Sequence, residues 1–285
     1  MLLALAGLAS LAVLRSRRGR RGTPGSGWPV NLAHRGASDL APENTIEAFG
    51  AAVEWGAGGL ELDVHLTRDG HVVVIHDPTV DRTTGGTGAV AQMTLDEIRA
   101  LDAGHEFSPD DGGTLPYRGR NVRVPTLAEV LREFPGVAVN IDIKVDSPGI
   151  EASVLGVLHE AGAEGRALVV SSSYGVVRRC RRISGGSIST GASRWETGVF
   201  YLFNRLHLEW LLRPAYDALQ VPPRHRGIPL VVRRFIEAAH ARGVRVDAWT
   251  INGGDEMRRL LDLGVDVIMT DRPGTLAEVL REREI

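Results

Sequence analysis

Short apolar runs alternate with helix-like stretches from Trp28 onward, and this alternation limits the possible folds more than any other feature of the chain. Strands that alternate with helices pair in parallel through right-handed crossovers. Eight such runs within 285 residues predict an α/β fold, a closed (β/α)8 TIM barrel. The predicted strands are Val30–His34, Gly58–Val64, Val137–Ile143, Ala167–Ser172, Ser187–Thr190, Asp217–Val221, Val244–Trp249 and Val265–Thr270.

An open, doubly wound sheet is the alternative architecture. We disfavour it because the polar residues described below follow several predicted strands, whereas an open sheet gathers them at one switch point. The expected helices are Thr45–Gly56, Thr126–Phe134, Gly149–Ala161, Tyr174–Ile183, Glu196–Leu212, Pro229–Arg242, Asp255–Leu263 and Thr275–Glu282. Thr94 with Glu97, and Thr126 with Glu129, have capping-box spacing. Gly243 and Gly264 stand where helices need a left-handed residue to end.

One apolar run, His71–His76, does not fit the barrel pattern. Only Leu66–Gly70 joins it to the preceding strand, which predicts an antiparallel hairpin, because a parallel neighbour needs a dozen or more connecting residues. The hairpin would fold His76 back over the barrel mouth. Residues 78–125, rich in Gly, Asp and Thr, then form an inserted segment after the second strand, within a barrel domain of residues 28–285.

The first 27 residues read as a separate tail and linker. Met1–Leu14 is apolar but shorter than the ~20 residues that span a bilayer, and the arginines of residues 15–21 follow it, whereas a secretory signal carries its charge first. A short membrane tether, a poor signal peptide and a disordered tail all remain open. We favour the tether, which by the positive-inside rule leaves the rest of the chain on the cytoplasmic side.

Charge and cysteine content exclude several classes of protein. The five arginines of the tail carry +5, so the chain after Gly22 carries −7 against −2 for the whole. A body of that sign without a basic stripe does not suit a nucleic-acid partner. The single cysteine, Cys180, excludes an intrachain disulfide and a multi-cysteine zinc site.

Glu61 and Asp63 lie two apart in a predicted strand, so both carboxylates point to the same side. Burying two like charges together is costly unless a cation neutralises them. Asp142 ends the third strand, and the carboxyl ends of barrel strands form the active-site face. Three carboxylates favour one divalent cation, Mg²⁺ or Ca²⁺, over zinc.

Cations and imidazoles fall at the same predicted face. Arg35 and Lys144 could clamp an anion such as a phosphate. His34 and His76 could transfer protons, because histidine titrates near neutrality. Trp249 ends another strand and could form a wall of a substrate pocket, with a place in the core as the alternative. The remaining histidines are interpreted as surface or loop residues: His65, His71, His105, His159, His207, His225 and His240.

At these residues the chain resembles the glycerophosphodiester phosphodiesterases. The matching motifs run in the family's order over nearly the whole chain: His34-Arg35-Gly36, Pro42-Glu43-Asn44-Thr45, Glu61-Leu62-Asp63-Val64 with Thr67-x-Asp69-Gly70, His76-Asp77, Asn140 to Lys144, Trp249 to Asn252, and Gly264-Val265-Asp266 through Thr270 to Pro273. Each motif alone is weak, but the ordered set is specific. The family usually has Glu where this chain has Asp142, so ligation by Asp142 could pass through water.

The resemblance implies a metal-dependent hydrolase on a (β/α)8 barrel with an inserted subdomain. It implies metal at Glu61, Asp63 and Asp142, His34 and His76 as the acid–base pair, and Arg35 and Lys144 on phosphate, with Glu43 as a supporting residue. The implied reaction gives sn-glycerol 3-phosphate and an alcohol, by attack of water or through a cyclic phosphate.

The substrate headgroup and the membrane contacts stay open at this stage. Residues 199–212 are unusually apolar, and they are either a buried helix or a lipid-contacting rim. With the tether, a rim would suit a lysophospholipase D acting on lysophospholipids. A catalytically idle binding protein on the same barrel is the alternative from another class, but such a protein needs no acid–base pair.

Overall fold

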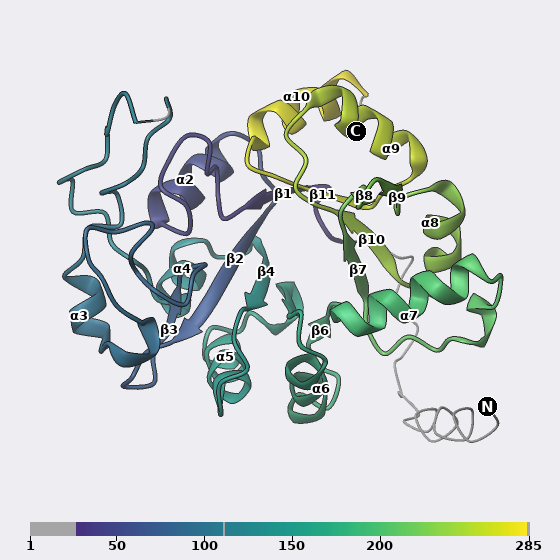
Figure 1. Cartoon of the computed structure of the whole chain (residues 1–285), viewed down its shortest axis with the longest axis horizontal. Coiled ribbons are helices and arrows are strands. Elements are labelled where there is room, and N and C mark those ends of the chain that lie inside the picture. The colour runs from purple at the N-terminus through teal and green to yellow at the C-terminus, as the bar shows by residue number, and fades with distance from the viewer. Residues whose placement is uncertain (1–26, 111, 284–285) are drawn as a thin grey trace.

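Eight parallel strands form a nearly closed barrel in the computed structural model, which describes residues 27–110 and 112–283 (Figure 1). The TIM-barrel prediction is confirmed. In barrel order the strands are β6 (Ser189–Thr190), β5 (Ala167–Val170), β4 (Ala138–Ile143), β2 (Gly59–Leu66), β1 (Asn31–His34), β11 (Val267–Thr270), β10 (Arg245–Ala248) and β7 (Ala218–Val221). The remaining seam, between β6 and β7, is joined by an isolated parallel bridge between Gly191 and Ala218.

Strand β2 is the element that sets the register of the site. It pairs in parallel with β1 on one side and β4 on the other, which places His34 beside Glu61 and Asp63 beside Asp142. Seven of its eight residues are buried, as expected for a barrel strand covered on both faces. Because side chains alternate along a strand, the polar residues of β2 share the inner face while Leu60, Leu62 and Val64 pack outward against helices.

Helices cover the outside of the barrel (Figure 1). They are α2 (Ile46–Glu54), α4 (Leu127–Glu133), α5 (Ile150–Glu160), α6 (Tyr174–Ile183), α7 (Arg194–Arg205), α8 (Arg233–His240), α9 (Gly254–Leu263) and α10 (Pro273–Glu282), with short 3-10 turns at Glu164–Arg166 (η3) and Glu209–Leu211 (η4). The Thr126–Glu129 capping box is present, and Gly264 caps α9 with a φ of 94°.

Two predicted helices differ from the structure. The helix expected over Glu196–Leu212 ends at Arg205, because His207 takes a left-handed φ of 60° and Leu208 N–H returns to the Phe203 carbonyl. The helix expected from Pro229 begins only at Arg233. Before it, β8 (Arg224–His225) and β9 (Ile228–Pro229) form a small hairpin whose two turn residues both have positive φ.

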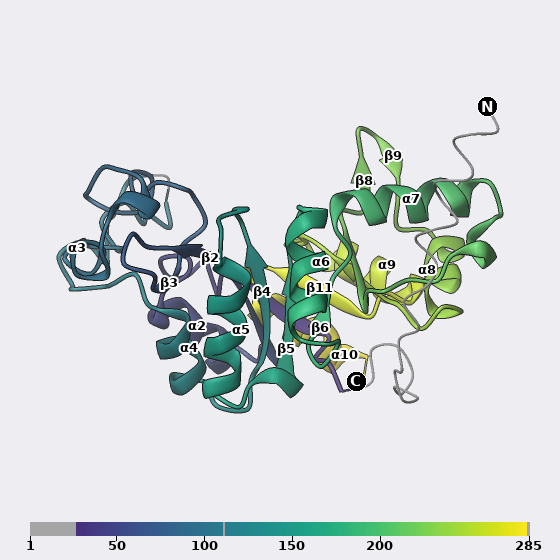
Figure 2. The same ribbon diagram turned by 90° about the horizontal axis from the view of Figure 1, so that it is seen from below.

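The segment between β2 and α4 lies beside the barrel (Figures 1 and 2). Strand β3 (Val72–Val74) pairs antiparallel with β2, as the short connection predicts. The 3-10 turn η2 (Val90–Gln92) and helix α3 (Leu95–Arg99) follow, and the Thr94–Glu97 capping box starts α3. This insertion has its own apolar cluster: Val73, Ile75, Val80, Val90, Leu95, Ile98, Ala103, Val122 and Val124.

Side chains fill the amino-terminal end of the barrel. The Arg245 guanidinium lies 3.9 Å from the centre of the Trp28 ring and pairs with buried Asp247. Gln220 donates to both Asp247 and Asn140 across the interior. The floor is therefore packed and polar groups within it are paired, so a substrate can approach the interior acids from the carboxyl-terminal mouth.

No helix within the described ranges has both the length and the apolar character to cross a bilayer. The proposed tether, residues 1–14, lies outside the described residues.

Candidate active site

Three carboxylates converge at the carboxyl ends of β2 and β4. Glu61, Asp63 and Asp142 each offer an oxygen within 4.8 Å of the others, at the positions the sequence predicts. Glu61 and Asp63 are buried, and Asp142 is half-buried. The alternation of β2 and its register with β4 bring them together.

Burial and neighbouring charges shift the pKa values of these three acids in different directions. Burial, and then the charge of Asp63, raise the pKa of Glu61 to about 8. Burial also pushes the pKa of Asp63 upward, but the charges of Lys144 and Arg35 outweigh it and hold that pKa below its usual value. Burial raises the pKa of Asp142 against the opposing charge of Lys144. Without a cation, the cluster retains a proton on Glu61 at neutral pH.

The residues present fit a hard divalent cation. The donor set is entirely carboxylate oxygen, which Mg²⁺ and Ca²⁺ prefer. Asp142 Oδ1 is buried, and no hydrogen-bond donor among the described residues reaches it. A buried carboxylate oxygen without a donor is costly unless a cation satisfies it.

Lys144 lies between two of the acids. Its Nζ is 2.8 Å from Asp63 Oδ1 and 2.7 Å from Asp142 Oδ2. These charges raise the pKa of Lys144 against the effect of burial, so the ammonium stays charged. An ammonium has three donors, so these two contacts leave a third for an anion. The structure thus places Lys144 at the acid cluster itself.

His34 is held at the end of β1 by a carboxylate from the other end of the chain. Its Nδ1 lies 2.7 Å from Asp271 Oδ1, and its Nε2 is 4.0 Å from Glu61 Oε2. Ser38 and Asn252 also donate to Asp271. Burial lowers the pKa of His34, but the hydrogen bond to Asp271 and the charge of Glu61 outweigh it and raise that pKa overall. With Nδ1 bound, Nε2 is the nitrogen that faces the acids.

His76 reaches the mouth from the β2–β3 hairpin. Its Nδ1 lies 2.6 Å from Asp77 Oδ1, so its Nε2 is also the nitrogen left for chemistry. The charge of His76 acts on Asp142, whereas the charge of His34 acts on Glu61. Both imidazoles therefore lie near the acid cluster, His34 by Glu61 and His76 by Asp142.

Arg35 is held between two carboxylates. Its Nη1 is 3.0 Å from Glu43 Oε1 and its Nε is 3.2 Å from Asp63 Oδ2, while its backbone N–H donates to Glu61. The loop needs glycine next: Gly36 has a φ of 87°, and a Cβ there would lie 2.7 Å from the Ala48 backbone. This close approach of α2 fixes the loop that carries Arg35.

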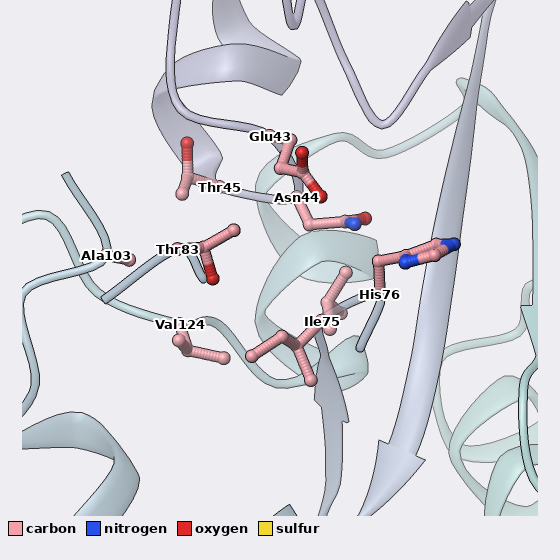
Figure 3. A pocket seen from close by; sticks show the side chains of 9 residues that line it. Glu43, Asn44, Thr45, Ile75, His76, Thr83, Ala103 and Val124 are labelled. Atoms are coloured by element: carbon pink, nitrogen blue, oxygen red, sulfur yellow. The ribbon is translucent and has the colours of Figure 1, made fainter. Parts of the chain in front are cut away.

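Glu43, Asn44 and His76 lie at one edge of a small cavity of about 10 Å³, the size of one water molecule (Figure 3). Thr83 and Ala103 from the insertion line it as well. Asn44 forms two hydrogen bonds with Asp63: its amide N–H donates to Oδ2, and its Oδ1 accepts from the Asp63 backbone N–H. The seam between insertion and barrel thus lies directly behind the acids.

Trp249 follows β10 at the mouth and is 41% exposed, so it does not belong to the core. Several large apolar residues of α7 and η4 are exposed: Trp195, Leu202, Leu206, Trp210 and Leu211. An open hollow of about 510 Å³ is lined by Ser172, Arg194, Trp195, Gly198, Val199 and Leu202. Phe200 and Asn204 are buried in this region, so residues 199–205 belong to a barrel helix that packs with one face and exposes the other.

Sequence reasoning misplaced or missed several residues. His65 is buried, not on the surface, because it continues the inward face of β2; a ring nitrogen bonds the His76 carbonyl at 3.0 Å. Asp271 follows the last barrel strand, a position that could have marked it as functional. Arg82 binds Asp77 and Glu43 but sits in an irregular loop, where no periodicity marks it.

Comparison with known proteins gives one consistent result. The chain matches the model of the glycerophosphoryl diester phosphodiesterase family over residues 34–275. A glycerophosphodiester phosphodiesterase of Caldanaerobacter subterraneus subsp. tengcongensis is 38% identical over 257 residues, covering 88% of this chain and 97% of the relative. A probable glycerophosphodiester phosphodiesterase 2 of Mycobacterium tuberculosis is 33% identical, covering 89% and 91%.

Solved structures agree with these relatives. A glycerophosphodiester phosphodiesterase of Agrobacterium tumefaciens superposes with a TM-score of 0.70 at 29% identity, over 87% of this chain and 98% of its own. A phosphodiesterase of Oleispira antarctica, solved in complex with the product sn-glycerol-3-phosphate, gives a TM-score of 0.71 at 26% identity, over 90% and 98%.

Proposed function

The chain belongs to the glycerophosphoryl diester phosphodiesterase family, and from this we propose that it hydrolyses glycerophosphodiesters to sn-glycerol 3-phosphate and an alcohol. One observation carries the proposal: two imidazoles, each bound at Nδ1 by an aspartate, flank a carboxylate triad that Arg35 and Lys144 border. The product complex of the Oleispira antarctica relative supports the same substrate class.

We assign Glu61, Asp63 and Asp142 as the residues that would hold one Mg²⁺ or Ca²⁺. When bound, such a cation stabilises the negative charge that develops on the phosphate in the transition state. Arg35 offers a planar guanidinium to the phosphate oxygens. Lys144 adds a second positive charge, and its third N–H can donate to the same oxygens. Trp249 lies at the mouth, where its ring can contact the glycerol or alcohol portion.

The two histidines divide the proton transfers. One Nε2 takes the proton from the attacking oxygen, which belongs to water or to the glycerol hydroxyl beside the phosphate. A phosphorus–oxygen bond forms there, the bond to the alcohol breaks, and the other histidine protonates the departing oxygen. Attack by the glycerol hydroxyl gives a cyclic phosphate first, and water then opens it in a second step, in which a new phosphorus–oxygen bond forms, the ring bond breaks and the two histidines exchange roles. Asp271 and Asp77 bind Nδ1 of the two rings, which leaves each Nε2 for these proton transfers.

Hydrolysis of glycerophosphocholine with Mg²⁺ or Ca²⁺, with and without EDTA, tests the proposal. We expect turnover that EDTA removes and that His34→Ala and His76→Ala each abolish, while the exposed His159→Ala leaves it unchanged. Glu61→Ala should remove the thermal stabilisation by the cation. Substantial activity in both histidine variants, or turnover indifferent to EDTA, would overturn the assignment.

A lysophospholipid is the second candidate substrate, favoured by the exposed apolar residues of α7 and η4. The hollow of about 510 Å³ is within the size range of ligand pockets, and it opens at the end of β5 on the mouth side. We propose that it takes the acyl chain, that residues 199–212 contact lipid, and that residues 1–14 tether the enzyme at the cytoplasmic face.

Gly198 gives a direct test of the acyl site, because a Cβ built there meets no atom within 4 Å. We expect Gly198→Trp to fill the hollow and lower activity on lysophosphatidylcholine about tenfold or more, with glycerophosphocholine hydrolysis unchanged. Gly156→Trp on α5, where space is also open, is the matched control. Lysophosphatidylcholine hydrolysis no faster than in buffer would eliminate this candidate and leave the first intact.

A further inference from the structure

Arg82 of the insertion connects two separate parts of the candidate active site. Its Nε lies 2.5 Å from Asp77 Oδ2. Its Nη1 and Nη2 lie 2.8 and 2.7 Å from the two oxygens of Glu43. The guanidinium thus binds one carboxylate beside β3 and another in the loop before α2, which are 34 residues apart in the chain.

Each of these carboxylates has a second partner in the site. Asp77 holds Nδ1 of His76, and Glu43 Oε1 accepts from Nη1 of Arg35. Charges alternate along the whole path, so each contact supports the next. Arg82 is therefore placed to fix the orientation of a histidine and of a phosphate-binding arginine together.

Stability alone does not account for this arrangement. The Arg82 side chain is 47% exposed, and ion pairs at such exposure add little to the free energy of folding. The planar fork instead sets direction, because the three N–H bonds that reach Glu43 and Asp77 have fixed relative angles. A lysine could offer charge here but could not hold both carboxylates in the same plane.

We infer that Arg82 is a positioning residue for phosphodiester hydrolysis, acting through Asp77 on His76 and through Glu43 on Arg35. This inference rests on the proposed function. It also gives Glu43 a role, as the carboxylate shared by the two arginines. Arg35 retains its contact with Asp63 when Arg82 is removed, so the effect should fall on the proton transfer more than on substrate binding.

Steady-state kinetics of Arg82→Gln and Arg82→Lys on glycerophosphocholine test the inference. We expect kcat to fall about 10- to 100-fold in both, the usual effect of losing a residue that orients a reacting group, with KM changed less than about threefold. Arg99→Gln is the matched control, since Arg99 of α3 also pairs across the insertion–barrel seam, but with Glu129, which is not one of the site residues. It should keep wild-type kcat.

A double-mutant cycle separates positioning from a general structural role. If Arg82 acts through Asp77, then Asp77→Asn and the double variant Asp77→Asn/Arg82→Gln should have similar kcat. Wild-type kcat in Arg82→Gln, full recovery in Arg82→Lys, or additive losses would overturn the inference. So would a kcat loss that disappears on cooling together with a lowered Tm. Absence of wild-type turnover would instead reject the proposed function.

Discussion

At the scale of residues, the two candidate catalytic histidines are oriented in the same way. Each imidazole is bound at Nδ1 by an aspartate, which fixes the tautomer and leaves Nε2 toward the acids. The two aspartates have different origins: Asp77 is adjacent to its histidine, whereas Asp271 comes from 237 residues away. A neighbouring aspartate and a distant one thus give the two rings the same orientation, which indicates that ring orientation matters to the chemistry.

Asp271→Asn should therefore impair hydrolysis without unfolding the barrel. An amide can present its N–H to Nδ1 and stabilise the wrong tautomer, so we expect kcat/KM to fall about 10- to 100-fold. Asp266→Asn is the matched control, because Asp266 binds His240 at 2.7 Å in a similar pair away from the mouth. Equal activity of the two variants would contradict a role for Asp271 in orienting His34.

The raised pKa of Glu61 gives the protein without a cation a distinctive pH dependence. The pKa of a glutamate in the unfolded chain is ~4.3, whereas the pKa of Glu61 in the folded state is raised to about 8. Between these values the folded state holds a proton that the unfolded state has lost. The contribution of Glu61 to stability is therefore full below about 4.3 and declines as pH rises toward 8.

Urea unfolding in EDTA, from pH 5 to 8, measures this effect. The free energy of unfolding of the wild type should fall with rising pH relative to that of Glu61→Gln, which cannot ionise. Added Mg²⁺ or Ca²⁺ should stabilise the wild type more strongly at pH 8 than at pH 6, because binding displaces the proton. A difference between the two proteins that is flat with pH would contradict the assignment.

The site was partly predictable at this scale. The acids and His34 stand at strand ends, where side-chain alternation and the barrel rule predict that they converge. Asp77 and Asp271 fall within motifs of the family. Their roles depend on which histidine nitrogen each contacts, and the motifs do not predict that. Arg82 acts through loop geometry, which no periodic pattern encodes, and the burial of His65 depends on how far β2 continues.

At the scale of elements, strands were easier to predict than helix ends. The predicted runs marked all eight barrel strands, because most residues of these strands are buried. Helix α7 ends earlier than its apolar pattern suggests, since the reversal depends on His207 adopting a backbone conformation that non-glycine residues rarely take. The β8–β9 hairpin was missed because it is short and exposed.

Replacing His207 by glycine should stabilise the protein. A non-glycine residue in the left-handed conformation lowers folded-state stability by roughly 1–2 kcal/mol. Glycine removes this strain, but its greater freedom in the unfolded chain costs about 0.5–1 kcal/mol. We expect a net gain of about 0.5–1 kcal/mol in urea unfolding. Gly264→Ala makes the opposite change at the end of α9, where φ is 94°, and should lose about 1 kcal/mol. A loss of stability in His207→Gly would contradict this account of the helix end.

At the scale of the whole molecule, strand count and alternation predicted the barrel, but not how its seams differ. Strands β2 and β4 pair over six residues, whereas β6 has two residues and meets β7 through one isolated bridge. The number of residues that pair between two strands depends on strand tilt and local packing, and the apolar run of a single strand predicts neither. The polar floor around Arg245 and Asp247 was also unforeseen, because it needs partners from several strands.

The separate apolar cluster of the insertion implies that this enzyme can stop working before it unfolds. His76 arrives from that segment, whereas His34 and the carboxylates belong to the barrel. A segment with a small core of its own can open while the rest stays intact. In a urea series we expect turnover to disappear at lower denaturant than the far-ultraviolet circular dichroism of the barrel. Coincident midpoints would show that urea inactivates and unfolds the molecule as one unit.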